Sequence, residues 1–358
     1  MLDFRYEKLD FLHRIKMNKF LIILLLLSIN YTLKSQGVNF LQNGNLRTVF
    51  DQAKAQNKPV FIEVYSPDCH VCQAFKPTFE QKVVGEIYNK SFVSYKLDIG
   101  SEEAQGFLGK QNIWVPSIPV LLFFDKNVKL QHIAVMSETR NSATVLTDAA
   151  KTAQNAEGRT SNYKTRFQKG ARDANFLLEY GLMARIQKDT LAKIDAANEY
   201  FKTQKPSNYT NSTNLLVLEK MVIDADNGLF RYMINNLPKY YAVKEKAKIN
   251  TIAENILMWT LYSSRGQNFS SAKIALIKKD LAKVGVDQKS ISGRVWMAEA
   301  SAFFRENNPK VAISVIENRV KGMKVAAGEA KYLCNFVKSK TIDKTALASA
   351  KKWCDLAK

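Results

Sequence analysis

Two cysteines separated by two residues are the part of this sequence best suited to chemistry. Cys69 and Cys72 lie in the stretch "KPVFIEVYSPDCHVCQAFKP", directly after a run of apolar and β-branched residues. A pair at this spacing can ligate a metal ion, close a structural disulfide or exchange disulfides with other thiols. The surrounding sequence discriminates among these three uses.

A metal ion would require ligands beyond Cys69 and Cys72. The chain has only three histidines, His13, His70 and His132, and no second Cys-x-x-Cys, whereas structural zinc sites use four cysteine or histidine ligands. A purely structural disulfide is also disfavoured, because closing so short a loop removes little entropy from the unfolded chain. The pattern therefore favours redox exchange without a metal or other cofactor, and His132, in strand-like spacing, is assigned a structural role.

The residues around the pair predict a different role for each thiol. A cysteine in the first turn of a helix lies near unpaired backbone N–H groups and the positive end of the helix dipole, which favour the thiolate. Cys69 is then the exposed nucleophile, and Cys72, one turn later, resolves the mixed disulfide. Glu63, in the preceding buried strand, would have a raised pKa and accept the proton of Cys72 as a general base. His70, if protonated, would stabilise the Cys69 thiolate, and Asp68 would oppose it.

Residues 38–157 alternate between helical and strand-like patterns. This alternation predicts an α/β domain with a mixed sheet covered on both faces. The predicted elements are a helix in 44–58, a strand at 60–65, a helix in 71–90 broken once at Pro77, a strand in 91–99, a helix in 101–112, two strands in 115–135 joined at 125–127, and a helix in 142–154.

This order of elements, together with the cysteine pair, resembles the thioredoxin fold over about residues 40–155. The two cysteines fall where a strand passes into a helix, and Glu63 stands where thioredoxins carry a buried acidic residue. Pro77 stands where thioredoxins kink this helix. Ile118 and Pro119 precede "VLLFF", where thioredoxins carry a cis-proline that faces the cysteines.

The resemblance implies a protein-disulfide oxidoreductase whose Cys-x-x-Cys pair acts on protein substrates. Pro119, Ile118 and His70 would contact the substrate, and the implied partners are protein thiols and disulfides and an upstream redox protein. Residues 69–100 look most like the periplasmic C-terminal domain of the thiol:disulfide interchange reductase and its soluble relatives. Because Asp68 stands where thioredoxins usually have Trp, the resemblance implies no redox potential and no direction of exchange.

The N-terminus has the layout of a secretory signal peptide. After Met17, one basic residue, Lys19, precedes an apolar run of ten residues at 20–29 and a polar region with small residues. A membrane span needs about 20 apolar residues, so cleavage is expected, with an uncleaved anchor as the alternative. We predict that translation starts at Met17, that 1–37 comprises upstream residues and the signal, and that the protein acts in the periplasm or cell envelope.

Residues 158–358 differ from 38–157 in charge and in pattern. The first part, 38–157, holds 12 basic and 12 acidic residues, whereas 158–358 holds 35 and 18, a net charge of +17. Helical stretches recur in the second part with almost no strand signal, which predicts an all-α helical-repeat domain after the α/β domain. Its charge would suit an acidic protein or an anionic membrane surface, and no nucleic acid is expected for an exported protein.

The last helices carry an internal repeat of 34 residues. Trp296, Ala300, Phe303, Ala312 and Ile316 recur as Ala330, Cys334, Val337, Ala346 and Ala350. This spacing resembles the tetratricopeptide repeat, whose helix pairs stack into a solenoid, and Tyr262, Gly266 and Phe269 resemble the first helix of an earlier unit. Cys334 is then expected as a buried free thiol. The alternative, a bridge to Cys354, is disfavoured because a turn near Lys340 would offset the two by roughly 12 Å along the helices.

Two functions fit these patterns. The first is an exported thiol:disulfide oxidoreductase whose helical array binds a client or partner. The alternative is a non-catalytic binding or assembly protein that uses the thioredoxin-like domain as a scaffold. The presence of Cys69, Cys72, Glu63 and Pro119 together favours the first.

Overall fold

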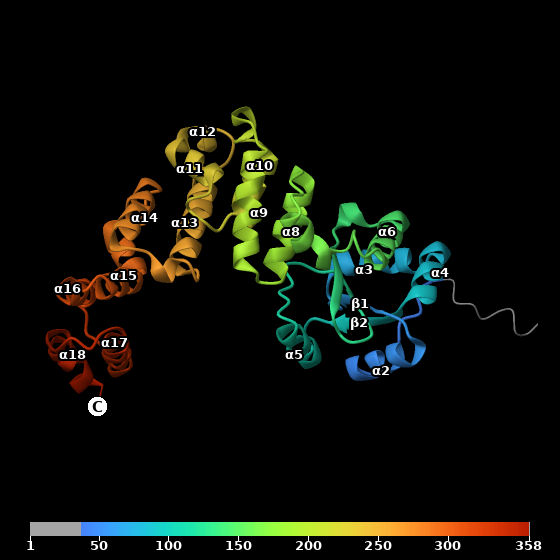
Figure 1. The fold of residues 1–358 in the computed structure, drawn as a ribbon, viewed down its shortest axis with the longest axis horizontal. Coiled ribbons are helices and arrows are strands. Elements are labelled where there is room, and N and C mark those ends of the chain that lie inside the picture. The colour runs from blue at the N-terminus through green and yellow to red at the C-terminus, as the bar shows by residue number, and fades with distance from the viewer. Residues whose placement is uncertain (1–36, 358) are drawn as a thin grey trace, which may run out of the picture. The chain divides into compact units, whose positions relative to one another are not determined.

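The structure is a computed structural model that describes residues 37–357. The predicted start at Met17 and the predicted signal peptide lie outside these residues. The chain divides into two compact units between Asn162 and Tyr163, which Figure 1 colours from blue to green and from green to red. Within the described part of the chain, no helix combines the length and the apolar character that crossing a membrane requires.

The first unit is built on a four-stranded mixed sheet. The strands β1 (Val60–Tyr65), β2 (Val93–Asp98), β3 (Val120–Phe124) and β4 (Leu130–Val135) lie in the order β2-β1-β3-β4. β1 runs parallel to β2 and antiparallel to β3, which is antiparallel to β4. The central strands β1 and β3 are covered on both faces, which explains why their sequences are nearly continuous apolar runs.

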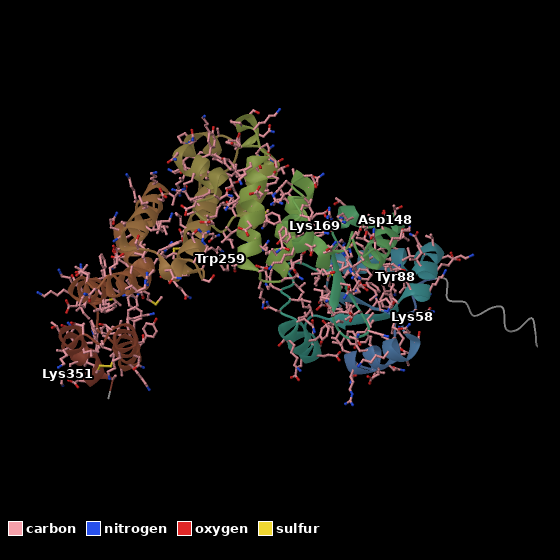
Figure 2. The ribbon with its side chains drawn as sticks, in the orientation of Figure 1. Lys58, Tyr88, Asp148, Lys169, Trp259 and Lys351 are labelled. Atoms are coloured by element: carbon pink, nitrogen blue, oxygen red, sulfur yellow. A yellow bond between two sulfur atoms is a disulfide. The ribbon has the colours of Figure 1, made fainter. Side chains whose placement is uncertain are left out.

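Helices cover both faces of this sheet, so the predicted α/β fold class is confirmed. On one face lie α2 (Leu46–Gln56) and α5 (Glu102–Lys110), whose Phe50 and Phe107 rings pack on Phe124 at centroid distances of 5.9 and 5.3 Å. On the other face lie α3 (His70–Phe79), α4 (Lys82–Ser91) and α6 (Ala143–Gln154). There Phe61 packs on Tyr88 at 4.7 Å, and Figure 2 labels Tyr88 within this layer. Single 3-10 turns occupy η1 (Glu138–Arg140) and η2 (Thr160–Asn162).

The helix after the cysteines breaks at Glu80 and Gln81, so the predicted break at Pro77 is wrong. Pro77 lies near the end of α3, where the side chain of Asn141 braces the backbone. Asn141 donates to the Ala74 carbonyl at 2.7 Å and accepts from the Thr78 hydroxyl at 2.6 Å. The Phe79 carbonyl accepts from the Val38 amide at 2.8 Å instead of continuing the helix.

The second unit is helical throughout residues 163–357, as the sequence predicts. Its α-helices are α7 (Tyr163–Gln168), α8 (Ala174–Ile186), α9 (Thr190–Lys202), α10 (Ser212–Lys220), α11 (Gly228–Asn235), α12 (Leu237–Tyr241), α13 (Lys246–Tyr262), α14 (Ser271–Lys283), α15 (Gln288–Arg305), α16 (Pro309–Val320), α17 (Ala327–Lys340) and α18 (Lys344–Leu356). Two 3-10 turns, η3 (Pro206–Asn208) and η4 (Gly266–Asn268), complete it. Side-chain oxygens of Asp173, Asp189 and Asn211 cap α8, α9 and α10.

The predicted repeat positions fall on the pairs α15–α16 and α17–α18, which share one apolar core. That these pairs are tetratricopeptide repeats stays a prediction. The predicted earlier helix through Tyr262, Gly266 and Phe269 is wrong, because α13 ends at Tyr262 and Gly266 begins the 3-10 turn η4. A Cβ atom at Gly266 would lie 2.1 Å from the Leu261 carbonyl oxygen, so this tight reversal needs glycine.

The expectation of a free Cys334 is also wrong, because Cys334 and Cys354 form a disulfide with a Cα–Cα distance of 5.0 Å. The error lies in the position of the turn. α17 ends at Lys340 and α18 begins at Lys344, so the turn is centred near Ile342 rather than at Lys340. The two cysteines then differ by about four residues in their distance from the turn. This is about 6 Å along the helices, half the offset expected for a turn at Lys340, and the observed Cα–Cα distance of 5.0 Å lies within the range of disulfides.

Candidate active site

Cys69 caps the N-terminus of α3, where the chain leaves β1. Its amide donates to the Ser66 carbonyl at 3.1 Å, and its Sγ accepts from the Cys72 amide at 3.1 Å. The side chain of Gln73 donates to the Pro67 carbonyl at 2.8 Å and fastens the connecting turn. The sulfur therefore lies at the positive end of a ten-residue helix, among amides that have no intrahelical partner.

Cys69 and Cys72 form a disulfide with a Cα–Cα distance of 5.2 Å. Cys69 is half-buried, whereas Cys72 is only 5 % exposed. A thiol partner approaching from solvent can therefore reach Cys69 and not Cys72. This is the arrangement that an attacking and a resolving cysteine require.

The segment before β3 lies against the cysteines. The Ile118–Pro119 peptide bond is cis, and the Ile118 carbonyl oxygen lies 3.8 Å from Cys69 Sγ. Pro119 is buried, and its own carbonyl accepts from the Met136 amide at 3.2 Å. The fold thus brings Ile118 and Pro119 to Cys69 across 49 residues of sequence.

Glu63 is buried on β1, with 1 % of its surface exposed. It follows Phe61 by two residues and so faces the α3 side of the sheet. Burial raises the pKa of the Glu63 carboxyl, and the nearby charge of Lys96 partly opposes this shift. Lys96 Nζ lies 3.0 Å from Glu63 Oε2 as an ion pair without hydrogen-bond geometry.

Lys96 is a site residue that the sequence analysis missed. It is the register partner of Glu63 in the parallel pair β1–β2, and its ammonium lies 4.8 Å from the Phe40 ring centroid and 5.5 Å from that of Tyr65. The sequence does show a lysine inside a strand that is otherwise largely apolar. The register of β1 and β2 is needed to show that this lysine meets Glu63.

His70 and His132 have different roles. His70, at the start of α3, is largely exposed, and its Nδ1 lies 3.5 Å from Glu138 Oε1, also exposed. His132 is buried on β4, where its Nδ1 accepts from the Thr160 amide at 3.2 Å. Burial lowers the pKa of His132 to about 4, so this ring is a neutral structural acceptor. Thr160 Oγ1 also accepts from the Ile133 amide at 3.0 Å, which attaches the segment after α6 to the edge strand.

A cavity of about 550 Å³ in the first unit lies away from the cysteines. Pro59, Ser91 and Asp125 line it, at the end of the sheet where β1 begins, whereas Cys69 follows the end of β1. Among residues 37–357, no three His, Cys, Asp or Glu side chains are grouped as a metal site would need. The surface around Cys69 and Ile118 is therefore the place in the first unit where a substrate chain would meet reactive sulfur.

Residues 42–126 match a family model described as thioredoxin-like. The first unit is a thioredoxin-like domain. Fifty residues are 38% identical to spermatogenesis-associated protein 20 of Rattus norvegicus, and this match covers 14% of the chain and 6% of that protein. Among solved structures, a candidate disulphide-isomerase from Bacteroides thetaiotaomicron is 21% identical and aligns over 35% of this chain and 99% of its own, with a TM-score of 0.30. A disulphide isomerase from Xylella fastidiosa Temecula1 is 16% identical over 33% and 91%, with a TM-score of 0.23.

The thioredoxin-like domain carries its Cys-x-x-Cys pair at the N-terminus of the helix that follows the central strand β1. At the level of the superfamily, this combination is that of thiol–disulfide oxidoreductases. The chain matches only a small part of the length of the rat protein, so substrates and partners are a matter of proposal.

Proposed function

We propose that this chain is an exported protein thiol:disulfide oxidoreductase whose helical unit binds a client or partner. The observation that carries the proposal is the position of Cys69. The residue is half-buried, and its sulfur accepts from the Cys72 amide at 3.1 Å and lies 3.8 Å from the Ile118 carbonyl oxygen. Export and action in the cell envelope rest on the signal-peptide pattern that begins at Met17.

In the reducing direction, the exchange takes two steps. The Cys69 thiolate attacks one sulfur of a substrate disulfide, forming a mixed disulfide and releasing the other substrate sulfur as a thiolate. The Cys72 thiolate then attacks Cys69 Sγ, which closes the Cys69–Cys72 disulfide and releases the second substrate thiolate. Two electrons pass to the substrate, and an upstream dithiol must return the pair to the reduced state. Each step is reversible, so the same residues serve oxidation.

Glu63 is proposed to accept the proton of Cys72 in the second step. Cys72 is too buried for solvent to take that proton readily, and Glu63 lies on the face of the sheet that α3 covers. A carboxyl with a raised pKa is a better base at neutral pH than an ordinary one. The charge of Lys96 partly opposes this rise in the Glu63 pKa.

Mixed-disulfide trapping tests the proposed function. Cys72→Ser should accumulate covalent complexes with disulfide-containing proteins of the cell envelope, because the Cys69 thiolate attacks and no second thiol resolves the product. Cys69→Ser, its matched control, should trap none. Equal trapping by both variants, or none by either, would favour the non-catalytic scaffold.

A further inference from the structure

A pocket in the second unit is lined by a largely buried lysine that pairs with no acidic side chain among residues 37–357. The pocket, of about 240 Å³, lies among α8, α9, α10 and α13. Its charged and aromatic lining residues are Arg185, Lys193, Glu219, Lys220, Lys248 and Trp259. Four of these six are basic and one is acidic, so the pocket is strongly electropositive.

Lys193 is the unusual member of this set. Only 9 % of it is exposed, and no described residue forms a hydrogen bond or ion pair with its Nζ. Burial, and secondarily the charge of Arg185, lower the pKa of Lys193 to about 8. The Lys193 side chain is largely buried and lines the pocket without a partner of opposite charge among the described residues, so an anion in the pocket would supply the missing charge.

The acidic residue of the pocket is already engaged. Glu219 forms ion pairs with Lys220 at 2.9 Å and with Lys248 at 3.1 Å, and the hydrogen bond from Lys220 holds the pKa of this carboxyl below its usual range. Glu219 therefore neutralises the cations at one side of the pocket and leaves Lys193 uncompensated.

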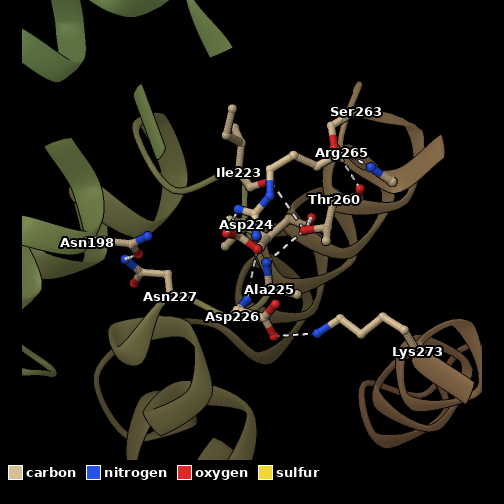
Figure 3. A network of polar contacts seen from close by, with 12 residues as sticks. Asn198, Ile223, Asp224, Ala225, Asp226, Asn227, Thr260, Ser263, Arg265 and Lys273 are labelled. Atoms are coloured by element: carbon tan, nitrogen blue, oxygen red, sulfur yellow. Dashed lines mark hydrogen bonds and ion pairs between the residues drawn. The ribbon is translucent and has the colours of Figure 1, made fainter. Parts of the chain in front are cut away.

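The wall of the pocket is fixed before any ligand arrives. Val222 and Ile223, which line it, begin a segment that α13 holds in place. Figure 3 shows Thr260 at the centre of these contacts, accepting from the Ala225 amide at 2.7 Å with the Ile223 carbonyl 3.2 Å away. Arg265 pairs with Asp224 at 2.5 Å. A preorganised wall lowers the entropy that a ligand must lose.

Trp259 supplies an apolar platform at the rim. It is 64 % exposed, and Figure 2 labels it on α13. Asn255 and Ile256, four and three residues earlier, also line the pocket, so the indole stands on the same helix face. The pocket thus combines a recessed cation with an adjacent exposed aromatic ring.

We propose that this pocket binds an acidic peptide segment, with one carboxylate at Lys193 and an apolar neighbour against Trp259. This deepens the proposed recruitment of a client by the helical unit. A concave site with a recessed ammonium suits a protruding side chain better than the flat surface of a membrane, and an indole platform suits an amphipathic peptide better than a free phosphate ion. Peptide binding involves no redox step, so it succeeds or fails separately from disulfide exchange.

Fluorescence anisotropy with labelled peptides tests the proposal on the full chain. The probe is an amidated hexapeptide of alternating Glu and Leu, compared with the same peptide carrying Gln for Glu. Lys193→Met should weaken binding of the acidic peptide about tenfold or more, because one charge-assisted hydrogen bond is lost. Lys279→Met removes the same charge from an exposed position on α14 and is the matched control.

Replacing a largely buried, unpaired lysine by an apolar side chain should leave the Lys193→Met variant at least as stable as the parent. Loss of affinity without loss of stability is therefore expected. Equal affinity of the Lys193 and Lys279 variants, or equal binding of the Gln peptide, would overturn the proposal. Lys193-dependent binding to phosphatidylglycerol vesicles or to inorganic phosphate that exceeds the binding of the acidic peptide would overturn it in favour of a phosphate ligand.

Discussion

The two disulfides of this protein have similar Cα–Cα distances, 5.2 and 5.0 Å, but opposite surroundings. Cys69 caps the beginning of α3, where free amides and the helix dipole favour a thiolate. Cys334 lies within α17, and Cys354 stands two residues before the end of α18, where the dipole disfavours a thiolate. The first pair is built to exchange and the second to hold two helices together.

The two cysteine pairs differ in their position relative to a helix N-terminus, and not in burial. Cys72 and Cys334 are equally buried, at 5 % exposed, and Cys69 and Cys354 are both half-buried. What separates the pairs is the amide donor 3.1 Å from Cys69 Sγ and the Ile118 backbone beside it. The aromatic and aliphatic core around Cys334 offers neither.

The two cysteine pairs should differ most in their contribution to activity. Cys69→Ala should lower the catalysed reduction of a small disulfide, with excess dithiol as reductant, to the uncatalysed background, because the attacking thiolate is gone. The double variant Cys334→Ala and Cys354→Ala should keep the rate of the parent. Loss of activity in the second variant would show that the distal disulfide takes part in exchange.

Stability should show the reverse ranking. Opening the Cys334–Cys354 bridge, whose residues are 20 apart, should cost about 3 kcal/mol from the chain entropy of the unfolded state, against about 2 kcal/mol for a bridge between residues three apart. Denaturation followed by tryptophan fluorescence reports on the core around Trp296 and Trp353. A double alanine variant as stable as the parent would show that the bridge does not stabilise α17 and α18.

The proton relay predicts a kinetic effect confined to the first pair. Glu63→Gln should slow resolution of the mixed disulfide about a hundredfold at neutral pH. Burial raises the Glu63 pKa, so the ionised carboxylate destabilises the fold at pH values above the pKa of the unfolded chain. The Gln variant should therefore be at least as stable as the parent. Lys96→Met should shift the pH dependence of the resolution rate to higher pH, because Lys96 lowers the Glu63 pKa. Unchanged single-turnover rates between pH 6 and 9 would remove Glu63 from the mechanism.

Acid should weaken the thioredoxin-like domain through His132. The folded pKa of about 4 lies below the unfolded value of about 6.5, so the unfolded state binds more protons between these values. The free energy of unfolding should therefore decrease as the pH falls below about 6.5. The expected decrease between pH 7 and pH 5 is about 2 kcal/mol. His132→Asn, which keeps an acceptor for the Thr160 amide, should flatten this dependence in urea titrations. An equally steep dependence in the Asn variant would assign it to other groups.

Local signals in the sequence were enough to place β1 and Cys69 in the thioredoxin-like domain, but not the features that depend on distant residues. The apolar run 60–65 and the turn before Cys69 place the cysteine at a strand–helix junction, and the structure has that strand at the predicted residues. The break between α3 and α4 was misplaced because it depends on the distant Val38 and Asn141, which bond to α3. Lys96 was missed for the same reason, since its pairing with Glu63 is fixed by strand register.

The helical unit was harder to read because its key features depend on where helices turn. A shift of about two residues in the α17–α18 turn brings the disfavoured alternative, the Cys334–Cys354 disulfide, within reach. The pocket at Lys193 gathers residues from four helices and has no sequence motif. Composition could indicate a basic unit, but not which lysine would lack a counter-ion.

The different roles of the two disulfides are tested by the reduction potential of each, measured in one experiment. The full-length protein is equilibrated in glutathione or dithiothreitol buffers of graded potential, alkylated, and each cysteine is quantified by mass spectrometry. We expect Cys69–Cys72 to equilibrate between about −270 and −120 mV, the range of thioredoxin-like exchangers, and Cys334–Cys354 to stay oxidised until below about −300 mV. Reduction of both pairs at one potential, or of Cys334–Cys354 first, would contradict this expectation.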